Sequence, residues 1–416
     1  MKFNKSSQLL LVSAASLLVA SLVTACGTLT VDFVFVTSSK AAGPSQYGEV
    51  DVFEINSESG QMRQIPTSPF PSAGRDPVAE AVSSDNTNLY VVNQDDNTIV
   101  QFIIGNDGKL YPQNTVNTPG VYPLAVAVSG KNLFVVDTYQ PLPICSTADP
   151  CSGSVAVFPI TPSSTSPPSD VLGTPVANGS VNYWPLTLPA KPNDVIVPTA
   201  INALASGADV YITAYDSSVT PRVGYVFGFS VGSGGTLAPL NGGAPFPAGT
   251  YPSAIASDHS GSYVYVTDFT NGNVLGYAVQ SGLLSPLANS PFPAGDQPSA
   301  IAVDPAYPFV YVANSLDSSV TAYSTSSGAL SSLGTFATGI QPVAIGIDPS
   351  INHFLYTADY LGNGVSGTIS GFELNSTTGT LLVSQSSPYI ANAQPTAVAA
   401  IPHGSSTKSA GSGSSQ

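Results

Sequence analysis

The chain has 416 residues and a net charge of −15, with 8% charged and 43% hydrophobic residues. Soluble domains average about 25% charged residues, so the composition excludes a coiled coil or a long solvated helix. The acidic excess repels phosphate and excludes a nucleic-acid partner, and the apolar content excludes a wholly disordered chain. With 38 Gly and 36 Pro, the sequence is typical of an all-β protein with many turns.

The N-terminus has the pattern of a bacterial secretory signal. Lys2 and Lys5 precede an apolar run that is short for a membrane span. The run ends in the residues VTAC, which resemble a lipobox. This resemblance implies that residues 1–25 are a signal peptide, that Cys26 carries a lipid, and that residues 26–32 link the anchor to the fold. The alternative is an ordinary signal that is cleaved just before Cys26.

The residue after Cys26 bears on localisation. Gly27 stands there in place of Asp. By resemblance to the enteric sorting rule, this implies anchoring in the outer membrane, on its periplasmic or its surface side. We expect the lipid anchor to be the only membrane contact of this exported protein.

Two further cysteines, Cys145 and Cys151, stand at the ends of the sequence CSTADPC. An exported compartment permits disulfides, and a bridge across this short loop would stabilise the fold by restricting the unfolded chain. A metal-binding pair is the alternative, but no third soft ligand lies near it in the sequence. We therefore predict a disulfide.

The body of the chain consists of seven copies of one unit. Each copy has a first strand that begins with Pro and continues through Ala, Ile and Val. A second strand follows, with a central aromatic residue and often a final Asp or Asn. The first strands begin at residues 77, 123, 198, 252, 298, 342 and 395. The second strands begin at residues 33, 88, 132, 209, 263, 309 and 354.

Third strands centre on Phe53, Phe102, Phe158, Phe229, Tyr277, Tyr323 and Phe372, and a fourth strand follows each. Four strands per unit and a period near 45 residues predict an all-β fold, a seven-bladed β-propeller with four antiparallel strands per blade. The chain starts at a second strand and ends on a first strand. We therefore expect the C-terminal strand, residues 395–402, to pair beside residues 31–37 and close blade 1, which removes a free sheet edge.

The repeated motifs P-x-A-I-A-V-D-P, V-Y-V-A-N, V-x-x-Y and G-x-L resemble those of the seven-bladed lactonase-like β-propellers. This YVTN-repeat group includes 6-phosphogluconolactonase-like and carboxymuconate-cyclase-like proteins. The resemblance covers the propeller, residues 33–403, and leaves residues 404–416 as a disordered Gly- and Ser-rich tail. It implies a ligand site on the top face, which the second-to-third and fourth-to-next-first connections reach. It does not imply one activity, because these motifs pack strands.

Long connections on the top face all fall in blades 3 and 4, at residues 138–152, 161–197 and 215–222. Long excursions on one side of a repeat array mark a binding face. Aromatic residues in or near them are candidates to stack on a sugar or another ring. They are Tyr122, Tyr139, Tyr183, Trp184, Tyr215 and Tyr251. The alternative is that these rings pin the insertions to the propeller.

One position of the first strand departs from the repeat. Its fourth residue is Val or Ile in six copies, whereas blade 2 has Glu80 there. An interior carboxylate is costly unless it is paired or coordinated. Glu80 is therefore a candidate catalytic acid or cation ligand. The alternative is a structural Glu that locks blade 2 to its neighbour, either by pairing with Arg75 or by hydrogen bonds.

Arginine and histidine are scarce. Lactonases and cyclases of the resembled group use top-face Arg, His and Glu or a divalent metal. Arg75 and Arg222, both in top connections, are therefore further catalytic candidates. The three histidines, His259, His353 and His403, fall beside first-to-second turns on the opposite face. No Ser-His-Asp arrangement can then be assembled on the top face.

Polar residues close five of the second strands: Asn93, Asp137, Asp268, Asn314 and Asp359. A funnel of such carboxylates and amides would suit Ca²⁺, another divalent cation or a hydroxyl-rich ligand. The alternative is turn chemistry, because Asp and Asn side chains satisfy local backbone N–H groups.

Three functions are compatible with these features. The missing top-face histidine and scarce arginine favour a non-catalytic envelope lipoprotein whose top face binds a small molecule, a sugar or a protein. The first alternative is a lactonase that opens a cyclic ester with a metal, or with Glu80 and an arginine. The second is a surface adhesion or scaffold protein. In each case we expect a monomer.

Overall fold

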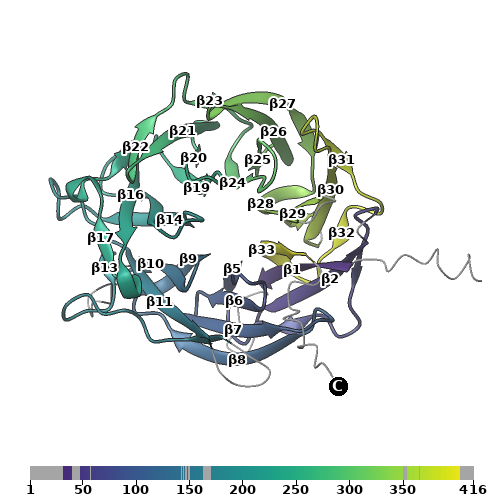
Figure 1. The fold of residues 1–416 in the computed structure, drawn as a ribbon, viewed down its shortest axis with the longest axis horizontal. Coiled ribbons are helices and arrows are strands. Elements are labelled where there is room, and N and C mark those ends of the chain that lie inside the picture. Colours follow the sequence, from purple (N-terminus) through teal and green to yellow (C-terminus); the bar gives the residue numbers. More distant parts are fainter. Residues whose placement is uncertain are drawn as a thin grey trace, which may run out of the picture.

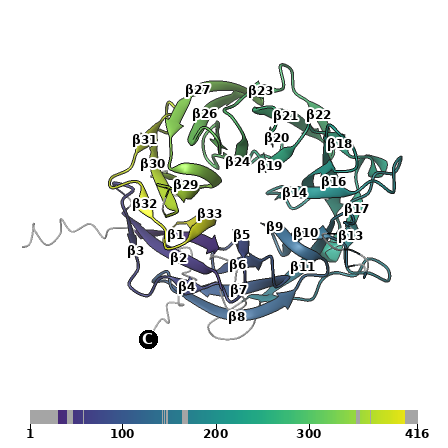
Figure 2. The ribbon, with the colours of Figure 1, turned by 180° about the vertical axis from the view of Figure 1, so that it is seen from behind.

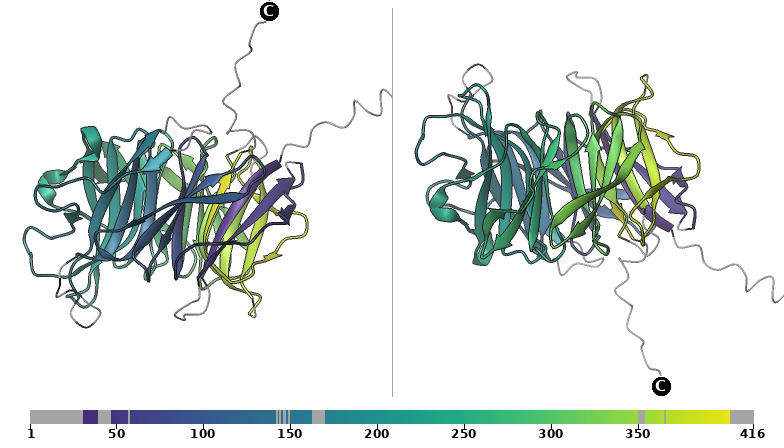
Figure 3. Two further views of the ribbon diagram at one scale, coloured as in Figure 1. Left: turned by 90° about the horizontal axis from the view of Figure 1, so that it is seen from below. Right: turned by 90° about the horizontal axis from the view of Figure 1, so that it is seen from above.

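The structure, a computed structural model, describes residues 31–402 apart from 40–46, 57, 142, 144, 146–147, 149, 163–169, 350–353 and 365. The predicted signal peptide, Cys26 and the predicted tail lie outside the described residues. Seven antiparallel sheets stand in a ring (Figures 1 and 2), and their strands run between its two faces (Figure 3). The predicted all-β, seven-bladed β-propeller is confirmed.

The innermost strand of each blade faces the ring axis, and the second strand pairs with it. The inner strands, from blade 2 to blade 7 and then blade 1, are β5 (Pro77–Val82), β9 (Val121–Ser129), β14 (Ile196–Ala203), β19 (Pro252–Ser257), β24 (Pro298–Val303), β28 (Ile340–Ile347) and β33 (Gln394–Ile401). The second strands, from blade 1, are β1 (Val31–Ser39), β6 (Asn88–Asn93), β10 (Asn132–Tyr139), β15 (Asp209–Asp216), β20 (Tyr263–Asp268), β25 (Phe309–Asn314) and β29 (Phe354–Gly362).

The third strands are β2 (Glu49–Asn56), β7 (Thr98–Ile104), β11 (Ser154–Pro162), β16 (Val223–Val231), β21 (Asn273–Gln280), β26 (Ser319–Ser326) and β30 (Thr368–Leu374). The outer strand is continuous in blades 2 and 6, as β8 (Leu110–Asn117) and β27 (Ala329–Ala337). In the other blades it is split into two segments: β3 (Met62–Gln64) and β4 (Phe70–Pro71), β12 (Asp170–Leu172) and β13 (Trp184–Pro185), β17 (Leu237–Pro239) and β18 (Phe246–Pro247), β22 (Leu283–Pro286) and β23 (Phe292–Pro293), and β31 (Leu381–Val383) and β32 (Tyr389–Ile390).

The split of the outer strand differs from the single fourth strand that the repeat predicts. In three split blades a Ser-Pro pair lies in the gap, and its serine hydroxyl accepts a backbone N–H of the third strand at 2.8–3.0 Å. The pairs are Val52 with Ser68, Gly276 with Ser290 and Gly371 with Ser387. The side chain therefore replaces a missing ladder bond.

Apolar side chains cover both faces of the second and third strands, because each sheet is packed between two neighbours. Between blades 2 and 3, for example, Tyr90 and Val92 pack with Leu133 and Phe158. This arrangement explains the low charge fraction, since a strand buried on both faces has few positions for charged residues. Within the described residues, no helix is long and apolar enough to cross a membrane. The described helices are two 3-10 turns, Ser233–Gly235 and Asn241–Gly243.

Blade 1 is closed by the two ends of the chain, as predicted. The C-terminal strand β33 is antiparallel to β1, with Val36 opposite Val398 and Phe33 opposite Ile401. Ile401 is buried in the cluster that blade 1 forms with blade 2. The inner edge of β1 is therefore paired from Phe33 to Ser39, and blade 1 has the same order of strands, from the inner to the outer one, as the other blades.

Tyrosine hydroxyls connect neighbouring blades. In three blades the buried second-strand tyrosine donates to a glycine carbonyl of the next blade at 2.9–3.0 Å: Tyr211 to Gly282, Tyr265 to Gly328 and Tyr311 to Gly379. Tyr90 and Tyr356 occupy the same position in blades 2 and 7. Their hydroxyls are buried and have no hydrogen-bond partner among the described residues.

We expect Tyr265→Phe to lower the free energy of unfolding by about 1 kcal/mol, because it leaves the buried Gly328 carbonyl without its donor. The matched control is Tyr356→Phe, which removes a buried hydroxyl that has no hydrogen-bond partner among the described residues. This variant should be as stable as the parent or slightly more so. Denaturant unfolding followed by circular dichroism measures both, and equal losses in the two variants would contradict the assignment.

The disulfide predicted between Cys145 and Cys151 is present in the long second-to-third connection of blade 3. Nearby, the Gln140 amide donates to the Ser152 carbonyl at 3.1 Å. The bond between Gln140 and Ser152 holds the two ends of this connection together, and the disulfide closes a smaller loop within it.

Candidate functional site

Each inner strand carries a β-bulge at the residue that follows its proline: Val78, Leu124, Thr199, Ser253, Ser299, Val343 and Thr396. A bulge re-aims one side chain of a strand. The bulge residues of blades 3–7 line a common cavity inside the ring of inner strands. The site is therefore built from the same backbone irregularity, repeated around the ring.

Hydroxyl-bearing bulge residues also connect the blades. Ser299 donates to the Pro342 carbonyl at 2.7 Å, and Thr396 donates to the Pro77 carbonyl at 2.8 Å. These carbonyls belong to the inner strand of the next blade. The hydroxyl oxygens remain able to accept hydrogen bonds, because each has two lone pairs.

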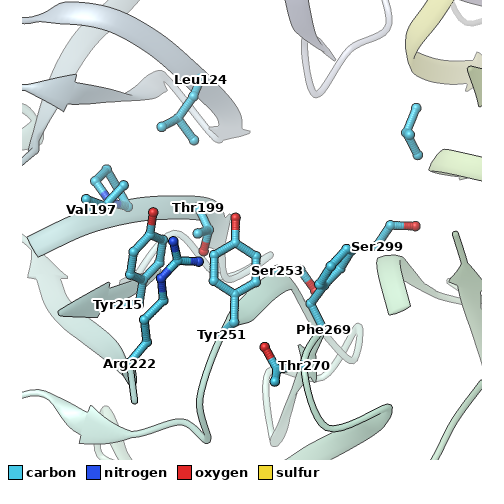
Figure 4. A pocket seen from close by; sticks show the side chains of 12 residues that line it. Leu124, Val197, Thr199, Tyr215, Arg222, Tyr251, Ser253, Phe269, Thr270 and Ser299 are labelled. Atoms are coloured by element: carbon cyan, nitrogen blue, oxygen red, sulfur yellow. The ribbon is translucent and has the colours of Figure 1, made fainter. Parts of the chain in front are cut away.

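The cavity has a volume of about 620 Å³. Its lining residues are Leu124, Val197, Pro198, Thr199, Tyr215, Arg222, Tyr251, Ser253, Phe269, Thr270, Ser299 and Val343. Most of them come from blades 4 and 5, on one side of the ring (Figure 4). Among the described residues, the lining combines apolar side chains, hydroxyl groups and one charge, that of Arg222. Small-molecule sites have this size and this mixture of surfaces.

Arg222 stacks on two tyrosines at the mouth of the cavity. Its Cζ atom lies 4.5 Å from the ring centre of Tyr215 and 5.2 Å from that of Tyr251. The two tyrosine rings are 4.9 Å apart, and Phe269 lies 5.5 Å beyond Tyr251. In Figure 4 the guanidinium lies beside both tyrosine rings, and the phenol oxygens point toward the open centre. Cation–π contact on two rings restricts the arginine and leaves its N–H groups available.

Backbone contacts fix the aromatic residues of this cluster. Tyr251 directly precedes β19, and its N–H donates to the Asp268 carboxylate at 3.1 Å. The Phe269 amide in turn donates to the Tyr251 carbonyl at 2.9 Å. Tyr215 stands near the end of β15, and Arg222 stands just before β16. The short loop between these two strands therefore places Arg222 over Tyr215.

The structure separates the two candidate arginines. Arg75 does not line the cavity; its Nε and backbone N–H groups donate to the Asp96 carboxylate at 2.7 and 2.8 Å. This ion pair joins the loop before β5 to the loop after β6. Arg75 is thus a loop-fastening residue in blade 2, whereas Arg222 lies at the cavity with Tyr251.

Glu80 lies in the seam between blades 1 and 2. It accepts a hydrogen bond from the Thr37 hydroxyl of β1. Burial raises the pKa of Glu80 to about 7, although hydrogen bonds from Thr37 and from the Ala399 backbone oppose the rise. Between blades 2 and 3 the corresponding residues are Val92 and Val126. The structure thus gives Glu80 the inter-blade locking role that the sequence left as the alternative, and it pairs Glu80 with Thr37 and not with Arg75.

The polar residues that close the second strands are buried, so they do not form the ligand-lining funnel that the sequence suggested. Asn93, Asp137, Asn314 and Asp359 are fully buried, and Asp268 is 1% exposed. Their partners belong to the loop that enters the inner strand of the same blade. Gly120, Thr250, Gly295 and Gly339 donate backbone N–H groups to Asp137, Asp268, Asn314 and Asp359 respectively, at 2.8–3.1 Å. These residues therefore have the role that the sequence offered as the alternative, in which Asp and Asn side chains accept local backbone N–H groups.

Two of these carboxyl groups have raised pKa values. Burial raises the pKa of Asp137 to about 7, against hydrogen bonds from Thr118 and Gly120. Burial also raises the pKa of Asp359 to about 6, with Ser370 foremost among the hydrogen bonds that oppose the rise. Within the described part of the chain, no group of three or more His, Cys, Asp or Glu residues could hold a metal ion.

The remaining aromatic candidates divide between the core and the top face. Trp184 is 6% exposed and packs in the core between blades 3 and 4, so it pins its insertion as the sequence alternative stated. Tyr122 contacts Tyr139 edge to face at 6.1 Å, and its N–H donates to Asn97. His259 lies in the turn between β19 and β20, at the opposite end of the blade from the cavity.

Sequence reasoning missed the bulge residues Ser253 and Ser299 and the cavity residues Phe269 and Thr270. A signal for the bulge residues exists in the repeat, because they occupy the variable position x of the motif P-x-A. A position that varies among the copies of an otherwise regular strand can indicate a side chain that points away from the apolar core.

Comparisons with known proteins agree with this fold. A family model described as "Lactonase, 7-bladed beta-propeller" matches residues 36–172 and 226–400. The unmatched stretch, 173–225, contains Tyr215 and Arg222. No curated protein sequence matches the chain.

Solved structures of similar fold carry different descriptions. A putative 6-phosphogluconolactonase from Bacteroides fragilis aligns at 18% identity and a TM-score of 0.66, over 89% of this chain and 98% of its own. The periplasmic gluconolactonase of Pseudomonas aeruginosa has the same identity and TM-score, over 89% and 99%. A hypothetical selenium-binding protein from Sulfolobus tokodaii aligns at 8% identity and a TM-score of 0.61, over 89% and 93%. At these identities the likeness concerns the fold alone.

Proposed function

Because the chain belongs to the seven-bladed β-propeller lactonase family, we propose that its top-face cavity binds a small ring-shaped, hydroxyl-bearing ligand such as a lactone or a sugar acid. The observation that carries the proposal is the stack of Arg222 on Tyr215 and Tyr251. The two tyrosine rings are half-buried, and their aromatic surface suits the face of a sugar or lactone ring. The guanidinium suits a ring carbonyl or a carboxylate at its edge.

The chemistry of the lining favours binding over hydrolysis. Opening a lactone requires a nucleophile, in most cases a water molecule activated by a base or a metal. Among the described residues, those that line the cavity include the cation Arg222 but no carboxylate and no imidazole. Glu80, the acid that the sequence singled out, is engaged with Thr37 in the blade seam. The protein in this proposal is a receptor with a lactonase-like fold.

Lactone hydrolysis remains the alternative, and the names of the two gluconolactonase-type relatives favour it. In that case Arg222 would polarise the ring-ester carbonyl, and the hydroxyls of Ser253 and Ser299 would orient the ring. Hydrolysis and binding would use the same cavity. They differ in one measurable respect, because only hydrolysis of a lactone releases acid.

We place this activity in the cell envelope, with the protein held by a lipid on Cys26. Only a few residues separate Cys26 from β1, which begins at Val31. The start of a second strand lies at the face of the ring opposite the loops that carry Arg222 and Tyr251. A short anchor there would turn the cavity away from the membrane and toward soluble ligands.

Titration calorimetry with gluconolactone, gluconate and 6-phosphogluconate tests the proposal. We expect the wild type to bind at least one of them and Arg222→Ala to weaken binding of an acid roughly 10- to 100-fold, because a hydrogen bond to a charged group is lost. Tyr251→Ala should weaken binding of acid and lactone alike. The matched control is Arg75→Ala, whose arginine is held by Asp96 and lies outside the cavity lining.

Two outcomes decide between the functions. Binding without acid release, measured by proton release at constant pH, supports the receptor. Acid release from a lactone that depends on Arg222 supports the hydrolase. No binding to the whole panel, or equal affinities of Arg222→Ala and the parent, would overturn the assignment of the ligand class.

A further inference from the structure

The hydrogen-bonding groups of the cavity differ from one side to the other. On the arginine side, the Arg222 guanidinium stacks on Tyr215 and Tyr251, and all three side chains carry N–H or O–H donors. Figure 4 shows Ser299 on the far side of Tyr251 from Arg222. A ligand that spans the cavity therefore meets different chemistry at its two ends.

The serine hydroxyls of blades 5 and 6 already donate their protons within the protein. The Ser253 hydroxyl lies 2.5 Å from the Pro298 carbonyl oxygen, and the Ser299 hydroxyl lies 2.7 Å from that of Pro342. A carbonyl oxygen can only accept, so the serine donates in both bonds. Each hydroxyl oxygen keeps a lone pair that can accept a hydrogen bond from a ligand. This serine side of the cavity therefore offers acceptors, whereas the arginine side offers donors.

The other lining residues add no charge to the serine side. The Thr199 hydroxyl donates to the Thr213 hydroxyl at 2.9 Å, so its proton is also engaged. Thr270 adds an uncharged hydroxyl, and Val343 adds only apolar surface. Among the described residues that line the cavity, Arg222 is the only charged one. A second anionic group on a ligand would therefore have no cation to neutralise it.

We propose that the cavity takes an unphosphorylated polyhydroxy acid in one orientation, with its carboxylate at Arg222 and its hydroxyl end at Ser253 and Ser299. This orientation rests on the proposed function, because the ligand belongs to the same class. The carboxylate accepts hydrogen bonds from the guanidinium. The hydroxyl groups at the other end of the ligand donate to the serine oxygens.

A phosphate group at the hydroxyl end of the ligand would be disfavoured. A phosphate monoester carries a charge of about −1.5 to −2 at pH 7, and its oxygens need donors. Turning a serine proton toward the phosphate would break the bond of Ser253 to Pro298 or of Ser299 to Pro342. The phosphate would also lose its water without gaining a cation. The cavity should therefore discriminate between a sugar acid and its phosphate ester.

Titration calorimetry of gluconate and 6-phosphogluconate, which differ in the distal phosphate, tests this discrimination. We expect the parent protein to bind gluconate at least about 10-fold more tightly, because the phosphate is desolvated without a charged partner. Val343→Lys introduces a cation next to Pro342, the residue that Ser299 contacts. This variant should bind 6-phosphogluconate about 10-fold more tightly than the parent does, and gluconate about equally.

A serine variant tests the acceptor role. Ser299→Ala should weaken gluconate binding by about 3- to 10-fold, because a hydrogen bond to the ligand is lost. The matched control is Thr396→Val. Thr396 donates the same kind of inter-blade bond, to the Pro77 carbonyl at 2.8 Å, but it is not among the lining residues. The control should keep the gluconate affinity, so a loss that follows from the inter-blade bond alone is recognised.

The possible results separate this orientation from the proposed function. If the parent binds 6-phosphogluconate as tightly as gluconate, or if Ser299→Ala and Thr396→Val weaken gluconate binding equally, the orientation is wrong and the ligand class stands. If neither acid binds, the orientation is also wrong, and the ligand class fails with it when gluconolactone does not bind either. Circular dichroism establishes the fold of each variant, and the parent comparison decides where a variant fails to fold.

Discussion

A chain that ends at Ala393, and so lacks β33, is expected to lose the folded propeller altogether. β33 supplies the inner strand of blade 1 and pairs with β1 along its length. It buries Ile401 against blade 2 and packs Val398 against the apolar cluster of blades 1 and 7. Its removal would expose the inner edge of β1 and open two blade seams together. Thermal circular dichroism should show no cooperative transition, and size exclusion should show aggregates.

The control for this experiment is a chain that lacks only residues 404–416, which follow β33. This shorter truncation should melt at the temperature of the parent protein. A monomeric protein without β33 that still unfolds cooperatively would show that six blades and three strands are sufficient, and that closure is dispensable.

The second large effect is a pH-dependent stability difference at Glu80. The folded-state pKa of about 7 lies above the ordinary value of 4.5, so the native protein retains the proton more readily than the unfolded chain. The contribution of Glu80 to stability is therefore fully present below about pH 4.5. It decreases as the pH rises toward 7 and stays at its minimum above that. We expect Glu80→Gln, which is always neutral, to be more stable than the parent at pH 8 by up to about 3 kcal/mol.

Denaturant unfolding of parent and variant at pH 4.5, 6 and 8 measures this difference. The two proteins should be equally stable at pH 4.5 and diverge above it. Asp137 and Asp359 also have raised pKa values, but they are present in both proteins and cancel in the comparison. A double variant, Thr37→Val with Glu80→Val, recreates the apolar pair of the next seam and should also lack the Glu80 contribution. A constant difference at all three pH values would contradict the assignment.

The strands of this protein are predictable from its sequence because the repeat presents each position seven times. The Pro that opens the first strand and the aromatic centre of the second recur, so all fourteen inner and second strands lie where the repeat predicts them. Closure of blade 1 was predictable for the same reason, since the phase of the repeat leaves blade 1 without its first strand and leaves one extra first strand after blade 7.

The site was much less predictable from the sequence. The repeat predicts where each strand lies along the chain, but it does not predict where an individual side chain points. Ser253 and Ser299 face the cavity only because a bulge turns them. Asp268 occupies a position that looks ligand-facing in the sequence, yet it binds the backbone of Thr250 and Tyr251. Arg75 and Arg222 both lie in top-face loops just before a strand, and only their three-dimensional partners, Asp96 and Tyr215, distinguish them.

The pairing of β1 with β33 also sets an order of events during synthesis. Among the described strands, β1 is made first and its inner partner β33 is made last. Six blades can assemble from contacts that are close in the chain, whereas the seventh depends on the most distant contact in the molecule. A growing chain therefore carries an open seam until β33 has been made. Unfinished chains could associate through this open seam. A chaperone that covers the seam until β33 is made would favour closure of the ring over such association.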